Sequence, residues 1–160
     1  MKKVVIEKEV LINATKEKIW EVLTEDKPYR IWTAEFCEGS HFQTDWKEGS
    51  KILFKTPTGE GLVSKLMECK PNEIISMEHQ GILLNNEEVY DNEEAEKWKG
   101  MKEIYSLSGK DGATVLSIYQ ELEKSYEEWS TYAWDKALFI LKELAESGHS
   151  NYYEKIVNPG

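Results

Sequence analysis

The chain has 160 residues, a length that one hydrophobic core can serve. Lys and Arg total 20 against 30 Asp and Glu, giving a formal net charge of -10. Because this charge repels phosphate backbones and anionic lipid surfaces, nucleic acid is a poor candidate partner. We therefore expect a single domain over residues 1–160 that binds no nucleic acid.

The sequence shows no sign of membrane insertion or of a disulfide framework. No stretch approaches the ~20 apolar residues that cross a bilayer. The first residues, MKKVVIEKEVLI, alternate apolar and charged positions where a signal peptide has a continuous apolar block. The two cysteines, Cys37 and Cys69, are too few for a framework and are not spaced as a metal pair. We expect a cytoplasmic protein with reduced thiols and no membrane insertion.

The first elements along the chain are a strand and two short helices. Residues 4–12 alternate apolar and charged side chains, a pattern typical of a half-buried strand. Thr15 can cap a helix in which Ile19, Val22 and Leu23 recur at helical spacing. Pro28 then suits the first turn of a second short helix, PYRIWTA.

Between residues 39 and 122 the pattern changes to short alternating runs separated by Gly, Pro and Asn. The runs are HFQTDW, SKILFKT, GLVSKLMECK, EIISMEHQGIL, MKEIYSLSG and ATVLSIYQELE. Such spacing predicts an antiparallel meander. Residues 85–100 interrupt it and are longer than a hairpin needs, with a helical turn expected over about 92–99. The acidic part, residues 87–96, indicates a solvated loop, although its length and Trp98 would also suit a lid.

The strongest helical signal runs from about Tyr126 to Ser147 and ends at Gly148. Its apolar side chains fall on one broad arc. They are Ala133, Trp134, Ala137, Leu138, Ile140, Leu141, Leu144 and Ala145. Phe139 lies outside this arc, and we expect it to be an incidental exposed aromatic. One long helix cannot cover a flat sheet, so the sheet must curl around it. Alanines within the arc leave room for a pocket between helix and sheet.

The order of these elements resembles that of the START-related helix-grip (SRPBCC) superfamily. The similar strings are INATKEKIWEVLT, YRIWTAEF, FQTDWKEGSKILF, GEGLVSKLMECKPNEIISMEH, WKGMKEIYSLS and YAWDKALFILKELAE. Within that superfamily the chain resembles the C-terminal domain of the activator of the heat-shock protein 90 ATPase. The resemblance implies an α+β helix-grip fold with a curved antiparallel sheet of about six to seven strands. It also implies a hydrophobic pocket, in a superfamily whose roles range from lipid carriage and hormone sensing to cyclase chemistry and chaperone regulation.

Ten side chains are predicted to line a ligand pocket. They are Trp32, Phe54, Met77, His79, Tyr105, Ile118, Gln120, Trp134, Leu138 and Leu141. If Met77 faces inward, so does His79, which would then place a polar group in an apolar wall. The alternative is a histidine that is satisfied elsewhere or exposed at an edge. Glu103 shares a strand face with Tyr105, and the alternative is that this face points outward.

Arg30, the chain's only arginine, lies beside Tyr29 near the expected pocket mouth. Its guanidinium is a candidate contact for a carboxylate or phosphate head group, with a solvated arginine stacked on an aromatic ring as the alternative.

The leading functional hypothesis is a non-enzymatic domain that binds a small apolar or amphipathic molecule. The resemblance adds a second, a chaperone-associated or stress-response interaction domain. A third, a cyclase-like or hydrolytic enzyme, would require polar groups converging on His79 and Tyr105. The sequence carries no phosphate-binding glycine loop, no serine-hydrolase elbow and no metal-ligand spacing. We therefore predict no catalytic residue, no cofactor and no metal.

Overall fold

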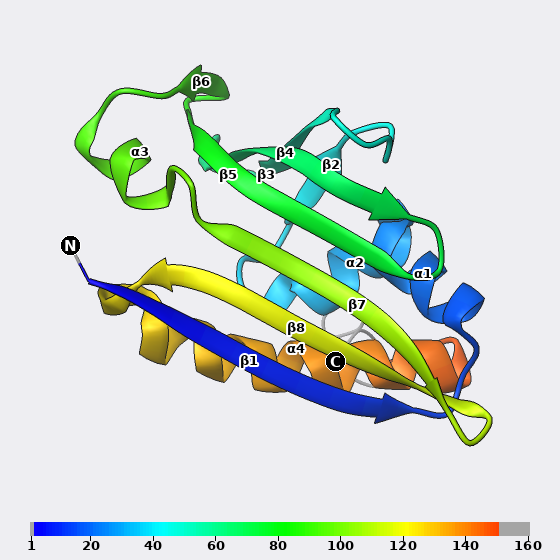
Figure 1. Cartoon of the computed structure of the whole chain (residues 1–160). Coiled ribbons are helices and arrows are strands. Elements are labelled where there is room, and N and C mark those ends of the chain that lie inside the picture. Colours follow the sequence, from blue (N-terminus) through cyan, green and yellow to red (C-terminus); the bar gives the residue numbers. More distant parts are fainter. Residues whose placement is uncertain (1, 151–160) are drawn as a thin grey trace, which may run out of the picture.

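A computed structural model describes residues 2–150 of the chain (Figure 1). Residues 1 and 151–160 of the predicted 1–160 domain lie outside the described part. The fold is α+β, with one curved antiparallel sheet and a long C-terminal helix along it, so the predicted helix-grip class is confirmed. The strands are β1 (Lys3–Ile12), β2 (His41–Gln43), β3 (Lys51–Lys55), β4 (Gly61–Lys70), β5 (Ile74–Leu84), β6 (Glu87–Val89), β7 (Lys102–Lys110) and β8 (Ala113–Glu123). The helices are α1 (Lys16–Thr24), α2 (Asp26–Trp32), α3 (Glu93–Trp98) and α4 (Glu127–Ser147), with 3-10 turns at Thr33–Glu35 and Lys124–Tyr126.

The sheet runs in the order β1-β8-β7-β5-β4-β3-β2, with β6 paired to β5 beside this path. The first strand therefore lies next to the last strand, which carries the chain directly into α4. The β4–β5 register shifts between Val63 and Ser64 and again between Leu66 and Glu68. Such irregularities bend a sheet locally, and they help this one to curve around α4.

The two short helices form as the sequence predicts, with one difference in bounds. The Thr15 hydroxyl accepts a hydrogen bond from the Lys18 N–H at 3.1 Å and so caps α1. The second helix begins at Asp26, two residues before Pro28. Since the first N–H groups of a helix have no partner within it, Pro28 fits the first turn without loss of a helical bond.

Helix α4 packs its apolar arc inward and lies under β1 and β8 in Figure 1. All eight residues of the predicted arc are buried. Gly148 ends the helix with a φ of 82°, the left-handed conformation that glycine adopts without strain. Phe139 is 64% exposed, as expected.

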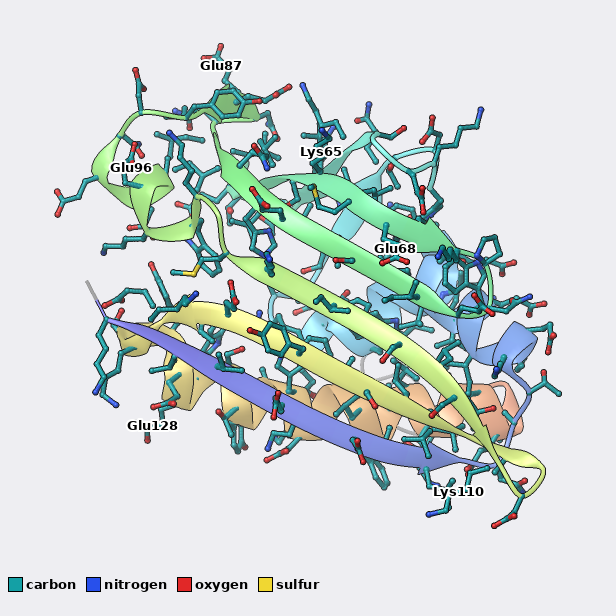
Figure 2. The ribbon with its side chains drawn as sticks, viewed as in Figure 1. Lys65, Glu68, Glu87, Glu96, Lys110 and Glu128 are labelled. Carbon is teal, nitrogen blue, oxygen red and sulfur yellow. The ribbon has the colours of Figure 1, made fainter. Side chains whose placement is uncertain are left out.

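The segment between β5 and β7 contains the predicted helical turn and a strand that the sequence did not reveal. Asn92 caps α3 by accepting from the Ala95 N–H at 2.7 Å. The solvated-loop interpretation of residues 87–96 is corrected by β6, which pairs with the end of β5. Asn85 and Asn86 both have positive φ and make the tight turn between β5 and β6. Figure 2 shows Glu87, Glu96 and Glu128 projecting outward from β6, α3 and α4.

Candidate ligand pocket and its buried polar cluster

A pocket of about 710 Å³ lies among the sheet, the α2 end, α3 and the first turns of α4. Much of its wall is aromatic. The aromatic lining residues are Tyr29, Trp32, Phe36, Phe54, Trp98, Tyr105, Trp129 and Trp134. A wall of this kind offers a large apolar contact surface to a small molecule.

The aromatic rings pack against one another in two groups. At the inner wall, Trp32 stacks on Trp134 with ring centroids 6.0 Å apart, and Tyr105 meets Trp134 edge to face at 5.7 Å. At the α3 side, Trp98 stacks on Tyr126 at 5.1 Å. The rings come from α2, α3, α4 and the sheet. Because they hold one another in place, the wall is largely preformed.

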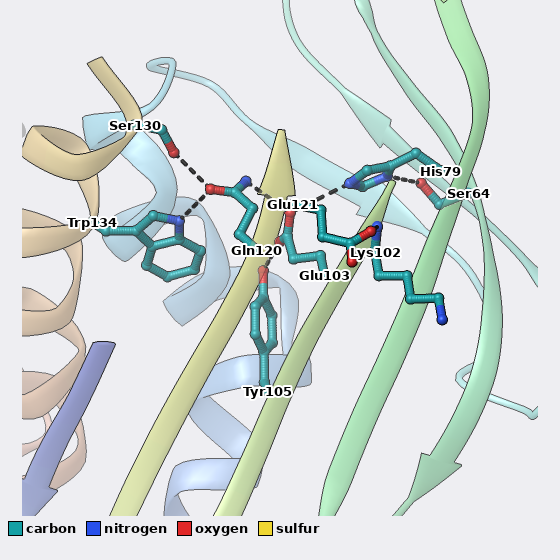
Figure 3. A network of polar contacts seen from close by, with 9 residues as sticks. All are labelled: Ser64, His79, Lys102, Glu103, Tyr105, Gln120, Glu121, Ser130 and Trp134. Carbon is teal, nitrogen blue, oxygen red and sulfur yellow. Dashed lines mark hydrogen bonds and ion pairs between the residues drawn. The ribbon is translucent and has the colours of Figure 1, made fainter. Parts of the chain in front are cut away.

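A connected set of buried polar side chains lies at the inner end of the pocket (Figure 3). Gln120 is its centre. The Gln120 Oε1 atom accepts from Ser130 Oγ at 2.7 Å and from Trp134 Nε1 at 3.0 Å, which ties β8 to α4. Its Nε2 atom donates to Glu103 Oε1 at 3.1 Å, and the Tyr105 hydroxyl donates to Glu103 Oε2. Every polar atom of the Gln120 side chain is thereby used.

His79 joins this set from β5 but is only half satisfied. Its Nδ1 atom lies 2.6 Å from Ser64 Oγ. Its Nε2 atom lies 3.5 Å from Glu103 Oε1, too far for a good hydrogen bond, and has no hydrogen-bond partner although it is buried. His79 and Ser64 are each 1% exposed and Glu103 is 8% exposed. The polar cluster, defined as Ser64, His79, Glu103, Tyr105, Gln120, Ser130 and Trp134, therefore has an open position at His79 Nε2.

The cluster favours an ionised carboxylate at Glu103. Burial raises the pKa of the Glu103 carboxyl, but the His79 ring and the hydrogen bonds from Tyr105 and Gln120 outweigh burial and hold that pKa below its usual range. Burial, followed by the charge of Glu103, raises the pKa of the Tyr105 phenol, and burial does the same for the pKa of Tyr29. Both phenols thus stay neutral beside a buried anion.

The structure places six of the ten predicted lining residues on the pocket wall: Trp32, Phe54, His79, Tyr105, Gln120 and Trp134. Four others lie in the hydrophobic core outside the lining: Met77, Ile118, Leu138 and Leu141. These four residues lie on the inward faces of their strands and helix. Those faces extend beyond the pocket into the packed interior, which is where the four side chains lie. Whether any of the ten contacts a ligand stays a prediction.

Arg30 lies outside the pocket lining and is paired with an acid on its own helix. Its Nε atom donates to both carboxylate oxygens of Asp26, at 3.0 and 2.9 Å. A head-group contact by Arg30 stays a prediction, and one that would first have to break this pair.

Sequence reasoning placed Glu103 on the strand face of Tyr105 without counting it among the site residues, and it missed Ser64 and Ser130 altogether. For Glu103 a signal existed, because a carboxylate two residues before an inward tyrosine on one strand shares its face. The lining residues Phe36, Trp98 and Trp129 were also missed. Trp129 is 49% exposed at the start of α4, where no periodic pattern separates a pocket rim from solvent.

Residues 2–150 hold no group of three or more His, Cys, Asp or Glu side chains arranged to bind a metal ion. Within the same residues no helix is both long and apolar enough to cross a bilayer.

Comparison with known proteins gives structural likenesses only. No protein-family profile and no curated protein sequence matches the chain. The Aha1 dimer from Colwellia psychrerythraea is similar, with a TM-score of 0.70 and 21% identity over 92% of this chain and 99% of that chain. DynU16, from the dynemicin biosynthetic locus, has a TM-score of 0.65 and 15% identity over 91% of this chain and 48% of its own. CalU16 from Micromonospora echinospora has a TM-score of 0.60 and 15% identity over 91% of this chain and 77% of its own. The chain thus shares the helix-grip fold of these structures, the fold that its sequence predicts.

Proposed function

We propose that this protein binds a small amphipathic molecule in the aromatic pocket, with the polar end of the molecule at the polar cluster. One observation carries the proposal. His79 Nε2 is buried without a hydrogen-bond partner in the lining of a pocket whose wall carries eight Phe, Tyr and Trp side chains. A buried polar atom left without a partner costs about 1–3 kcal/mol, and a ligand atom at this position would remove that penalty.

The remaining wall supports the same proposal. Rings that are already packed against one another lose little conformational freedom when a ligand binds, which favours affinity. The polar cluster gathers His79, Glu103, Tyr105 and Gln120 at one place in the lining, and a local group of this kind can orient a ligand that has one apolar and one polar end. No membrane partner is needed for such binding, and a cytoplasmic location stays a prediction.

Native mass spectrometry of freshly purified protein tests the proposal. We expect a fraction of the protein to carry an additional small mass that is lost on denaturation. Two variants on the same helix sharpen the result: Trp129→Ala truncates a lining ring, whereas Tyr132→Ala truncates a ring that is 62% exposed and outside the lining. The bound mass should fall in the first variant and persist in the second. An adduct that both variants retain equally would contradict binding in this pocket.

Acid–base catalysis on the bound molecule is a second candidate, favoured by the convergence of His79, Glu103 and Tyr105. Hydrolysis through Ser64 is not supported, because that hydroxyl is 1% exposed and outside the pocket lining. Proton transfer to and from a ligand carbon needs only Glu103 or His79. Incubating protein and co-purified ligand in D₂O tests this. Deuterium entering the ligand with wild-type protein but not with Glu103→Gln supports catalysis, and no incorporation with either contradicts it.

A chaperone partner is suggested by the fold alone. The Aha1 likeness, at 21% identity, carries no contact residue across to this chain. Measuring the ATPase rate of heat-shock protein 90 with and without the protein decides this possibility, and an unchanged rate would remove it.

A further inference from the structure

We infer that the polar end of the ligand is an ammonium group on an apolar or aromatic body. This inference rests on the pocket binding proposed above and specifies the chemical class that the pocket takes. It stands on three features of the site: the charges of the lining, the arrangement of acceptor atoms at the inner end, and the aromatic rings beside them.

Three carboxylates stand against one lysine among the lining residues that the structure describes, which also include His41 and His79. Glu60, Glu94 and Glu103 contribute these carboxylates. Among the three, Glu94 pairs with a lysine, Lys97, at 3.5 Å. Lys55 is the one Lys or Arg among the described lining residues, and its Nζ atom donates to Gln43 Oε1 at 2.8 Å. Arg30, the usual kind of residue for anion recognition, is bound to Asp26 outside the lining. The pocket therefore presents a negative potential that favours a cation and opposes a carboxylate or phosphate.

At the inner end, the hydrogen bonds that the Glu103 carboxylate accepts at short distance come from neutral groups, and in the described part of the chain His79, 3.5 Å away, is the one side chain beside it that can carry a positive charge. Tyr105 and Gln120 donate to it, and within residues 2–150 no Lys or Arg is paired with it. These bonds, together with the His79 ring, outweigh burial and keep Glu103 ionised, so a buried negative charge is held in the lining of the pocket. An ammonium group entering the pocket would place a full positive charge beside this buried anion, where their attraction is stronger than in water.

Glu103 Oε1 is one acceptor position at this inner end, and His79 Nε2 is a second in one of the two neutral tautomers of the ring. Glu103 Oε1 and His79 Nε2 are 3.5 Å apart, and the histidine atom has no partner. In the tautomer whose Nδ1–H donates to Ser64 Oγ, His79 Nε2 carries a lone pair. An ammonium group has three N–H donors, so one ligand nitrogen lying near both atoms can donate to each of them. A ligand carboxylate would instead place further acceptor atoms beside Glu103 Oε1 and His79 Nε2, with no hydrogen to donate to either.

Aromatic rings surround this inner end. Tyr105 and Trp134 belong to the polar cluster, and Trp32 lies against both of them, at 6.4 and 6.0 Å between ring centroids. The faces of such rings attract cations, most strongly for Trp, and the attraction grows when the cation is removed from water. Carboxylates combined with tryptophan rings make a site suited to an organic cation.

Three probes that share one apolar body separate charge from hydrophobicity: 4-phenylbutylamine, 4-phenylbutanol and 4-phenylbutyrate. Calorimetric titration at pH 7 should show the amine binding at least about tenfold more tightly than the alcohol, as expected for one charge-assisted hydrogen bond, with the carboxylate weakest. Glu103→Gln keeps the size and polarity of the side chain but removes its charge. This variant should bring the amine and the alcohol to within about twofold of each other while binding of the alcohol persists. Glu96→Gln is the matched control, because Glu96 is exposed on α3 outside the lining, and it should leave the preference for the amine unchanged.

A measurement on the wild-type protein covers the case in which Glu103→Gln does not fold. In a ¹H–¹⁵N spectrum, 4-phenylbutylamine should shift the Trp134 indole N–H and the Gln120 side-chain amide. Shifts confined to surface residues would overturn the inference.

The outcomes separate this inference from the proposed function. Binding of the alcohol or the carboxylate as tightly as the amine overturns the ammonium assignment and leaves pocket binding intact. So does a co-purified molecule that contains no nitrogen. If no probe binds and the native mass spectrum shows no adduct, pocket binding itself is overturned, and the ammonium assignment falls with it.

Discussion

Glu103 Oε1 lies 3.5 Å from His79 Nε2, although the two residues stand on different strands and neither is paired directly with the other in the sheet. Glu103 is opposite Met77 in the β5–β7 ladder, and His79 lies opposite Ser64 in the β4–β5 ladder. Ser64 on β4 bonds the other nitrogen of the histidine ring, and the contact between His79 and Glu103 depends on the register of the paired strands β5 and β7. It joins a buried acid and a buried base at the closed end of an apolar pocket.

Replacing Glu103 by Gln should change how stability depends on pH. Folding lowers the pKa of this carboxyl from its ordinary value of 4.5, so ionised Glu103 stabilises the fold above about pH 4.5. That contribution is lost as the pH falls below 4.5 and through the lower pKa of the folded state. At pH 7 the variant should therefore be less stable than wild type by about 1–3 kcal/mol. The difference should shrink as the pH falls toward 3, as followed by urea unfolding at each pH.

The exposed Glu96→Gln is again the control, because it removes the same charge from the surface of α3. It should lie within about 0.5 kcal/mol of wild type at pH 7. A stability gap for Glu103→Gln that stays constant between pH 7 and pH 3 would show that the charge of Glu103 does not contribute through its titration.

Trp134→Phe should destabilise the protein by about 1–3 kcal/mol, because it removes the indole N–H that donates to Gln120 Oε1 at 3.0 Å in a buried site. Trp129→Phe is the matched control on the same helix. Trp129 is 49% exposed, and we expect its replacement to cost no more than about 0.5 kcal/mol. Urea unfolding followed by far-UV circular dichroism compares the two, and equal losses would mean that the bond to Gln120 adds nothing to stability.

Gly61 is required by close backbone approach at the edge of the pocket. A Cβ atom there would lie 1.9 Å from the Phe54 carbonyl oxygen, a backbone atom that cannot move aside without disturbing the β3–β4 pairing. Gly61→Ala should therefore cost at least about 2 kcal/mol. Gly109→Ala is the contrasting change, since the nearest atom to its Cβ is Lys16 Cε at 4.0 Å. Thermal unfolding of both variants tests this, and similar melting temperatures would contradict the steric argument.

Most of the fold could be predicted because its signals are local. Strand alternation, the Thr15 cap and the arc on α4 each depend on residues close in sequence, and each is confirmed. The short strand β6 was missed because Glu87, Glu88 and Val89 give no alternating pattern. Its pairing with β5 is imposed by the turn at Asn85 and Asn86.

The polar cluster was harder to predict because it depends on contacts between distant parts of the chain. Ser64 reaches His79 only because the β4–β5 register shifts after Val63, and no local pattern in the sequence marks that shift. The partners of Gln120 come from α4, whose rotation over the sheet is set by packing. Individual inward residues such as Tyr105 were therefore predictable, whereas their hydrogen bonds were not.

The α3 wall of the pocket should loosen when its bond to the rest of the protein is removed. The Tyr126 hydroxyl donates to Glu94 on α3, and its ring stacks on Trp98. Burial and then the bond to Glu94 raise the pKa of Tyr126 to about 12, so at neutral pH the phenol is a donor. Tyr126→Phe keeps the stacking ring and removes only this bond, worth about 1 kcal/mol.

Amide hydrogen exchange over residues 93–99 measures the effect. Exchange should become about fivefold faster, the factor that corresponds to a loss of about 1 kcal/mol, while the central strands keep their protection. Tyr119→Phe breaks an equivalent bond, from Tyr119 to Glu121, on the opposite face of β8 from Gln120, and should leave exchange in α3 unchanged. Faster exchange in both variants would indicate general destabilisation, and unchanged exchange in Tyr126→Phe would mean that stacking on Trp98 alone holds α3 over the pocket.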